Sequence, residues 1–139
     1  MFEEMSKAFE LKEVNVAEYS PLTLAYIGDC VYELIIRTNL VFQANAPVNK
    51  LNQKASRLAK AQTQAIMIEG IMDSLTPEEV SAYKRGRNAN SYTKAKNATM
   101  GDYRKATGFE TLIGYLYLQK QFERIMEIVR MGFGVIDSK

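Results

Sequence analysis

Two acidic residues lie inside the two most apolar segments of this chain. Asp29 lies within LAYIGDCVYELII, and Glu110 lies within GFETLIGYLYL. A carboxylate is seldom fully buried unless it is paired or bound to a metal ion. Glu33 follows Asp29 by four residues, so on a helix both side chains project from one face and could converge on one cation. These acids are the candidates for chemistry.

The composition restricts that chemistry to carboxylates and a hard cation. The 139 residues include no histidine and one cysteine, Cys30, which excludes histidine-based catalytic triads, histidine-ligated metals and multi-thiolate zinc sites. We expect Cys30 to be a small buried hydrophobic residue. Mg²⁺ or Mn²⁺ takes oxygen ligands and favours sites that a substrate phosphate completes. The acids therefore predict metal-assisted phosphodiester hydrolysis, and the alternative is that each pairs with an arginine or lysine of a neighbouring helix.

A glycine accompanies each of the two acids. Gly28 directly precedes Asp29, and Gly114 follows Glu110 by four residues. Glycine within a helix costs about 1 kcal/mol relative to alanine. That cost is understandable if the glycines let two helices approach closely, which would bring the two acids toward one point.

The bases are segregated from the acids along the chain, although the net charge is only +2. Residues 1–33 contain seven acids and two bases, whereas residues 84–105 contain seven bases and one acid. Residues 34–70 contain five bases and one acid. This segregation predicts a basic surface for a polyanion beside an acidic element, and the alternative is a solvated surface without a ligand.

The elements that must position these residues are all expected to be helices, with no alternating pattern typical of strands. Residues 1–139 are expected to form a single all-α domain, a helical bundle, with residues 1–19 as an N-terminal segment that includes a short helix and residues 20–139 as the core. A polar segment without periodicity, residues 86 to about 101, predicts a loop. The expected helices begin at Pro21, at Pro47 (ending near Met72), at Pro77, before Phe109 and before Phe122.

Two motifs resemble the ribonuclease III family. The segment LAYIGDCVYEL resembles the family signature, whose usual form is L-E-F-L-G-D-A-x-L-E, and FETLIGYLYL resembles the family's F-E-A-L-I-G-A-I-Y-L helix. The two motifs stand in the family's order at a compatible spacing. The segments KRGRNA and YRKATGFE are similar to the Mini-III subfamily, which lacks a double-stranded-RNA-binding domain.

This resemblance implies a homodimeric, all-helical endoribonuclease that cleaves double-stranded RNA with Mg²⁺ or Mn²⁺ and matures the precursor of 23S ribosomal RNA. Asp29 and Glu110 match catalytic, metal-binding positions of the family, and Glu33 is a candidate additional metal ligand. Ala25 and Thr107 stand where the family has further carboxylates. A catalytically inert module that binds double-stranded RNA is therefore the alternative. A nucleotide pyrophosphohydrolase is disfavoured, because its paired Glu-x-x-Glu clusters are missing.

The expected RNA contacts come from two basic segments, since double-stranded RNA is recognised mainly through its shape, phosphates and 2′-hydroxyls. The candidates are Lys84, Arg85, Arg87, Asn88, Lys94, Lys96 and Arg104 in one segment, and Lys50, Lys54 and Arg57 in the other. The N-terminus mixes acids and bases where a signal peptide needs an apolar stretch, and no stretch is apolar enough to span a membrane. These features predict a cytoplasmic protein with no membrane partner.

Overall fold

The computed structural model describes residues 1–89 and 99–139, and every regular element within those ranges is a helix. The prediction of an all-α fold is therefore confirmed. The α-helices are α1 (Phe2–Ala8), α2 (Pro21–Gln43), α3 (Val48–Ala59), α4 (Ala61–Ile71), α5 (Pro77–Arg87), α6 (Met100–Leu118) and α7 (Phe122–Asp137), with short 3-10 turns at Val16–Glu18 and Met72–Ser74.

Two helices begin where their capping residues predict. Ser20 precedes α2, and its hydroxyl accepts a hydrogen bond from the backbone N–H of Thr23 at 3.2 Å. Thr76 precedes α5 and forms a capping box with Glu79, in which each side chain accepts from the other residue's backbone N–H. Such caps satisfy N–H groups that have no partner within the helix.

The prediction of one helix from Pro47 to about Met72 is wrong, because Lys60 is extended and separates α3 from α4. No glycine or proline marks this break in the sequence. Side chains from the first turn of α4 donate hydrogen bonds to backbone carbonyl groups at the end of α3. The Thr63 hydroxyl donates to the Arg57 carbonyl at 2.6 Å, and the Gln64 amide donates to the Ala59 carbonyl at 2.7 Å. Local side-chain bonds thus replace helical ones.

The polar segment is a shorter interruption than residues 86–101. The helix α5 continues through Arg87, and α6 already begins at Met100, where the Thr99 hydroxyl accepts from the Asp102 N–H at 3.0 Å. The start of α6 at Met100 and Gly101 is exposed, where an apolar periodicity is not required, whereas Gly86 of α5 is buried against Thr111. The rest of the expected loop lies outside the described residues.

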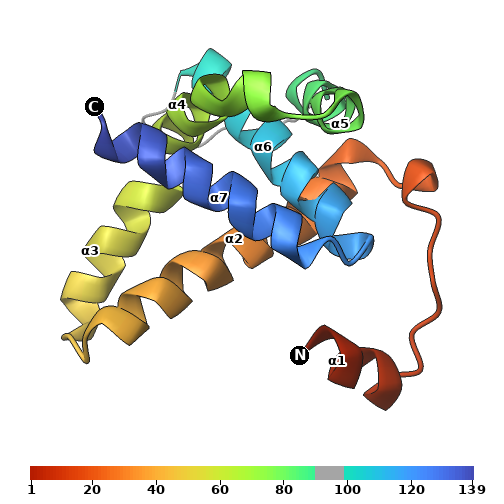
Figure 1. The fold of residues 1–139 in the computed structure, drawn as a ribbon, viewed down its shortest axis with the longest axis horizontal. Coiled ribbons are helices and arrows are strands. Elements are labelled where there is room, and N and C mark those ends of the chain that lie inside the picture. Colours follow the sequence, from red (N-terminus) through yellow and green to blue (C-terminus); the bar gives the residue numbers. More distant parts are fainter. Residues whose placement is uncertain (90–98) are drawn as a thin grey trace.

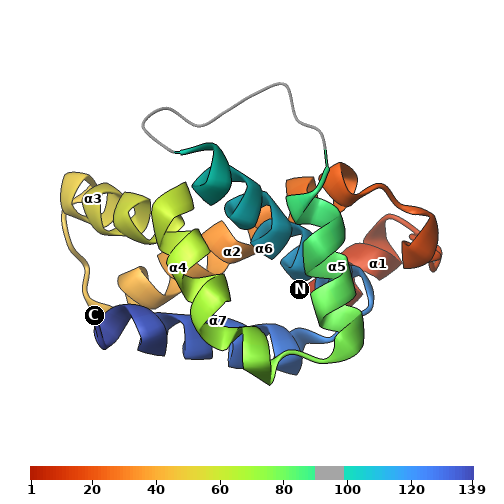
Figure 2. The same ribbon diagram turned by 90° about the horizontal axis from the view of Figure 1, so that it is seen from above.

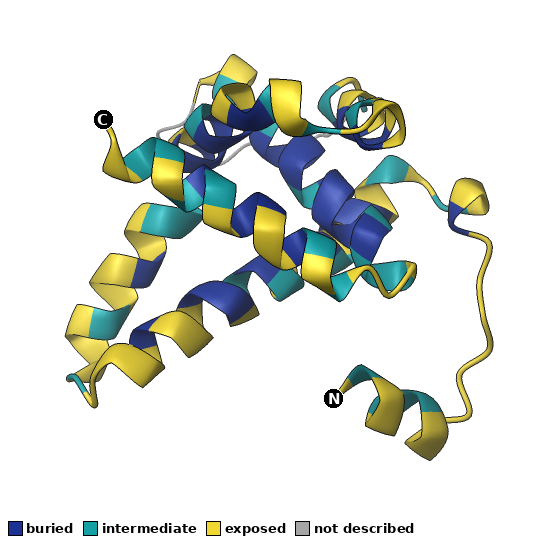
Figure 3. Cartoon of the chain, viewed as in Figure 1, coloured by how far each residue is buried: buried dark blue, intermediate teal, exposed yellow. Residues whose placement is uncertain are grey.

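The helix α6 runs through the middle of the molecule and packs against α2, α4, α5 and α7 (Figures 1 and 2). The most deeply buried segments of the chain lie on and around α6 (Figure 3). The fully buried large side chains include Tyr32, Ile36, Met67, Ile68, Tyr83, Phe109, Leu112 and Ile128. Within the described ranges, no helix is both long and apolar enough to cross a membrane.

The N-terminal helix α1 stands apart from this core (Figure 1). None of its residues is buried. Phe2 packs edge-on against Tyr117 and at a tilt against Phe122, with ring centroids 5.2 and 5.4 Å away. The predicted short N-terminal helix is therefore confirmed, and aromatic contacts link it to the ends of α6 and α7.

Candidate active site

The crossing of α2 and α6 is set by the two glycines beside the acids. A Cβ atom at Gly28 would overlap the backbone carbonyl of Glu110 and would lie 2.8 Å from the backbone nitrogen of Gly114. A Cβ atom at Gly114 would overlap the backbone carbonyl of Leu24. The backbones of the two helices are therefore in direct contact. This confirms the prediction that the glycines permit a close approach.

The close approach brings Asp29 and Glu110 together. Both side chains line one cavity, with Asp29 exposed to solvent and Glu110 half-buried, and they lie close enough for each charge to act on the other. Burial raises the pKa of Glu110, and the charge of Asp29 raises it further, to about 8. Two adjacent carboxylates cannot both be ionised without cost, so near neutral pH this pair retains a proton unless a cation neutralises it.

A buried amide completes the surroundings of Glu110. Gln64 on α4 is 2% exposed, and its Nε2 donates to Glu110 Oε2 at 3.1 Å as well as to the Ala59 carbonyl. This hydrogen bond lowers the pKa of Glu110, although it does not outweigh burial and the neighbouring charge. Nothing in the sequence distinguishes Gln64 from the other polar residues of this segment, so motifs and charge patterns do not identify it.

The carboxylate pair lines an open cavity of about 560 Å³ between α2 and α6. Its lining residues are Leu22, Ala25, Tyr26, Ile27, Asp29, Cys30, Tyr103, Thr107 and Glu110. The two positions that depart from the family pattern thus lie in the same wall as the acids. Ala25 contributes no polar side-chain atom, and the Thr107 hydroxyl donates to the Tyr103 carbonyl of its own helix at 3.0 Å.

Glu33, the third candidate ligand, is engaged elsewhere. Its carboxylate accepts from Arg37 Nε at 3.0 Å, one turn further along α2. In the part of the chain that the structure describes, no three metal-ligating side chains form a cluster. Across the same residues, neither Asp29 nor Glu110 forms a salt bridge with an arginine or lysine. The structure therefore presents a pair of acids rather than a triad or two acid–base pairs.

Cys30 is exposed, which corrects the prediction that it is buried. The reason is that α2 is covered on one side only. Its other side carries exposed apolar residues, including Tyr26 (82% exposed) and Leu34 (48% exposed). Because both faces of α2 are apolar in sequence, the sequence does not indicate which face the other helices of the chain cover.

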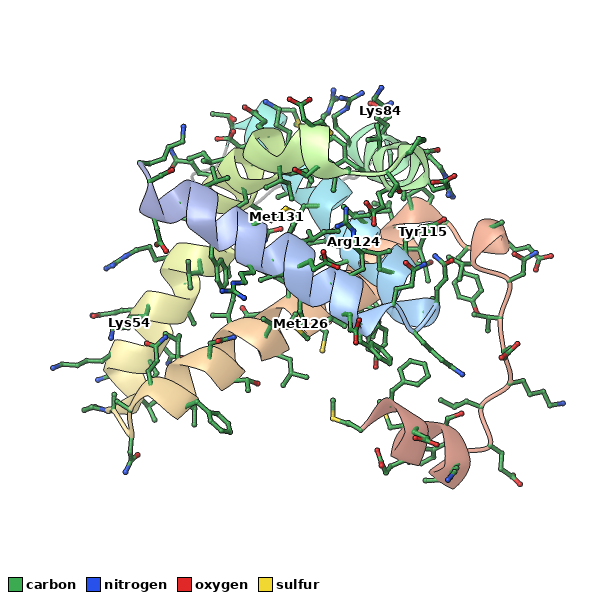
Figure 4. All side chains as sticks on the ribbon, in the orientation of Figure 1. Lys54, Lys84, Tyr115, Arg124, Met126 and Met131 are labelled. Carbon is green, nitrogen blue, oxygen red and sulfur yellow. The ribbon has the colours of Figure 1, made fainter. Side chains whose placement is uncertain are left out.

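The basic candidates lie on three helices. Lys50, Lys54 and Arg57 are exposed on α3, Lys84, Arg85, Arg87 and Asn88 lie at the end of α5, and Arg104 is exposed near the start of α6. These parts of α3, α5 and α6 lie along one edge of the molecule (Figure 2), with Lys54 and Lys84 far apart on it (Figure 4). Lys94 and Lys96 lie outside the described residues.

Two bases of this edge are held in place by neighbours. Arg85 donates to the Tyr19 carbonyl at 3.1 Å. Arg87 donates to the Asn88 side chain at 3.2 Å, and its guanidinium lies 5.7 Å from the centre of the Tyr83 ring. We refer to Lys50, Lys54, Arg57, Lys84, Arg85, Arg87 and Arg104 together as the basic edge.

Comparison with known proteins agrees with this arrangement. Residues 22–121 match the Ribonuclease III domain family. The chain is 48% identical over 130 residues to Mini-ribonuclease 3 of Clostridium tetani, covering 93% of this chain and 86% of that protein. It is 46% identical over 128 residues to Mini-ribonuclease 3 of a Thermoanaerobacter species, covering 92% and 90%.

A solved structure shows the same fold. The crystal structure of a protein from Fusobacterium nucleatum superposes with a TM-score of 0.76 at 30% identity, covering 84% of this chain and 93% of that one. The chain therefore belongs to the ribonuclease III family and is an endoribonuclease. Within that family it is similar to the Mini-ribonuclease 3 proteins, as the sequence motifs predicted.

Proposed function

We propose that this endoribonuclease cleaves double-stranded RNA with the help of Mg²⁺, and that Asp29 and Glu110 are its catalytic, metal-binding residues. The observation that carries the proposal is the placement of these two carboxyl groups at the wall of one open cavity, where α2 and α6 cross in direct backbone contact. Such an arrangement stabilises the fold poorly, because both groups are acidic. It is suited to holding a cation beside a phosphate.

The donor set fits a divalent cation of the Mg²⁺ or Mn²⁺ type. Such ions bind through one or two carboxylates and complete their coordination with water and substrate phosphate. The absence of a salt bridge to either acid within the described residues leaves their negative charge to be balanced by a ligand. When bound, the cation would supply electrophilic stabilisation for phosphodiester hydrolysis. Asp29 would provide the solvent-exposed carboxylate of the pair, and Glu110 would provide the half-buried carboxylate.

The basic edge supports duplex RNA as the substrate. A protein neutralises duplex phosphates with lysine and arginine side chains, and recognition of an A-form helix depends on shape more than on sequence. Exposed bases on α3, α5 and α6 share one edge of the molecule (Figure 2). Within the cytoplasm, the substrate that we propose is a base-paired stem of the 23S ribosomal RNA precursor, as the family resemblance implies.

An exposed apolar surface supports a homodimer of this single domain, residues 1–139. Large apolar side chains remain exposed along α2, and one more is exposed on α7, although such side chains are usually covered in soluble proteins when they gather in a patch. They are Leu22, Tyr26, Leu34, Val41, Phe42 and Met126. Sedimentation at micromolar concentration should show a dimer, and a 15.8 kDa species alone would contradict this part of the proposal.

Cleavage of a long, perfectly paired RNA tests the proposed activity. With Mg²⁺, the wild-type chain should cut the duplex and leave a single-stranded RNA of the same sequence intact. Asp29→Asn should lower the cleavage rate by about a thousandfold or more, while duplex binding measured in EDTA stays within twofold of wild type. The substitution removes a charge at the site and preserves the shape of the side chain.

The same assay distinguishes the inert RNA-binding alternative. If the duplex is bound but stays intact with both Mg²⁺ and Mn²⁺ at low salt, the two missing family carboxylates, at Ala25 and Thr107, have removed the activity. The chain would then be a binding module of the same fold.

A further inference from the structure

Gln64 on α4 is a buried polar residue whose side-chain amide makes hydrogen bonds that the packing of the helix does not require. The other buried residues of α4 are Ala61, Thr63, Ala65, Met67, Ile68 and Ile71. None of these residues has a side-chain amide, whereas Gln64 places one beside Glu110. Both N–H donors of this amide are used, one by Glu110 Oε2 and one by the Ala59 carbonyl. Gln64 therefore links three elements: the end of α3, the start of α4 and Glu110 on α6.

The direction of this amide is fixed by the Ala59 carbonyl. A backbone carbonyl can only accept a hydrogen bond, so the nitrogen of the Gln64 side chain must face it. Ala59 is the last residue of α3, where carbonyl groups lose their helical partners, and the break at Lys60 leaves this carbonyl available. The same nitrogen then faces Glu110. The break between α3 and α4 thus aims a hydrogen-bond donor at the carboxylate.

The other end of the amide has no partner. Gln64 Oε1 is buried and accepts no hydrogen bond from any described residue. A buried acceptor without a donor destabilises the folded state, and methionine or leucine would fill the same space without that penalty. The bond to the Ala59 carbonyl serves the fold, but the buried acceptor offsets that gain, so stability alone does not account for glutamine at this position. A donor toward Glu110 does account for it.

We propose that Gln64 is a positioning residue: it holds Oε2 of Glu110 and so fixes the rotation of that carboxylate relative to Asp29. Gln64 thus binds Oε2 of Glu110, and the other oxygen, Oε1, has no bond to Gln64. This inference rests on the proposed function, since it assigns Gln64 a role in presenting Glu110 to a divalent cation. It predicts that losing the donor impairs the site without impairing the fold.

Gln64→Met tests this role, with Gln62→Met as the matched control. Gln62 is an exposed glutamine two residues earlier on the same helix. Three quantities should be measured for each protein: the melting temperature in EDTA, the Mn²⁺ concentration that produces half of the ion-dependent rise in melting temperature, and kcat and KM on duplex RNA. The Mn²⁺ midpoint does not depend on activity.

For Gln64→Met we expect a melting temperature in EDTA within 2 °C of wild type or higher. The Mn²⁺ midpoint should rise at least fivefold and kcat should fall at least tenfold, with KM within twofold. Gln62→Met should match wild type in every measurement. If Gln64→Met fails to fold, Gln64→Leu provides the same comparison, because it also lacks the donor and the orphaned acceptor.

The outcomes separate this inference from the proposed function. If Asp29→Asn is inactive but Gln64→Met retains the wild-type kcat and Mn²⁺ midpoint within twofold, the proposed function stands and the positioning role is overturned. A fall in melting temperature that fully accounts for the lost activity, with an unchanged Mn²⁺ midpoint, would also overturn it. If the wild-type chain neither cleaves the duplex nor responds to Mn²⁺, the proposed function fails and the positioning role fails with it.

Discussion

Two carboxylates of this protein are withdrawn from solvent, and their surroundings are opposite. Glu79 on α5 is 3% exposed and has hydrogen-bond donors at both oxygens: the Thr76 N–H and Arg124 Nη2 at Oε1, and Arg124 Nε at Oε2, each at 2.8 Å. Arg124, labelled in Figure 4, belongs to α7, so these bonds join α7 to α5. Glu110 on α6 is half-buried against a second acid and receives one donor, from Gln64.

The electrostatic consequences follow from these partners. The hydrogen bonds of Arg124 hold the pKa of Glu79 below its usual value, so this group is ionised at neutral pH. The pKa of Glu110 is raised to about 8. A buried carboxylate that is paired with a base fastens two helices together, whereas one that is paired with another acid weakens the fold and is typical of a functional site. The acid–base pairing considered for Asp29 and Glu110 is therefore found in this molecule, but at Glu79.

The substitution Gly28→Ala is expected to have the largest effect, because it disturbs the site of Glu110 and leaves the site of Glu79 intact. The added methyl group would overlap the Glu110 carbonyl, so α2 and α6 must separate. We expect the free energy of unfolding, measured in urea, to fall by about 3 kcal/mol, and duplex cleavage to fall at least tenfold. The Glu79–Arg124 pair lies on α5 and α7 and should persist.

Gly134→Ala is the matched control for that substitution. Gly134 also lies within a helix, α7, but a Cβ atom there would meet no other atom within 4 Å. This variant should gain about 0.5–1 kcal/mol, because alanine favours the helix. If Gly28→Ala unfolded at the wild-type urea concentration, the direct contact of the two backbones would be refuted.

Glu79→Gln should have the next largest effect on stability and little effect on cleavage. The side chain of Arg124 is 22% exposed, so its guanidinium would lose its main partner in partly buried surroundings. We expect a loss of about 2 kcal/mol in the free energy of unfolding, with kcat on duplex RNA within twofold of wild type. Glu78→Gln, an exposed neighbour, should change stability by less than about 0.5 kcal/mol. A loss of cleavage in folded Glu79→Gln would contradict the separation of the two carboxylates.

The smallest effect is a difference in pH dependence. The folded-state pKa of Glu110 lies above its ordinary value of 4.5, so its contribution to stability is fully present below pH 4.5 and is lost as the pH rises toward 8. The folded-state pKa of Glu79 is lowered, so its contribution is present above pH 4.5 and is lost as the pH falls.

Melting curves in EDTA between pH 3 and pH 9 would measure this difference. Glu110→Gln should remove the decline between pH 5 and pH 8, worth about 1 kcal/mol because the site is open to water, which weakens both the burial penalty and the repulsion from exposed Asp29. Glu79→Gln should flatten the acid side instead. Identical pH profiles for the two variants would show that the two sites do not differ as described.

Local signals in the sequence predicted much of the fold. Ser20-Pro21 and Thr76-Pro77 identify helix starts because capping depends on residues that are adjacent in the chain. The acids and glycines of α2 and α6 were identified because a charge or a glycine is conspicuous in an apolar helix. Their convergence at one crossing followed from that pattern.

The features that were missed depend on contacts between distant segments. The break at Lys60 is accompanied by hydrogen bonds from Thr63 and Gln64, neither of which resembles a helix terminator. Glu79 occupies an ordinary capping position, and its burial depends on Arg124, 45 residues away. The exposure of Cys30 depends on which face of α2 the rest of the chain covers, and periodicity does not distinguish two apolar faces.

The contact at Gly28 and Gly114 also has an evolutionary consequence. The spacing between α2 and α6 is set there by main-chain atoms, whose dimensions are the same in every sequence. Leucine, isoleucine and methionine elsewhere in the interior can therefore drift among one another over generations without altering the distance between the two acids. Variation in the interior and constancy at the crossing can thus coexist in one lineage.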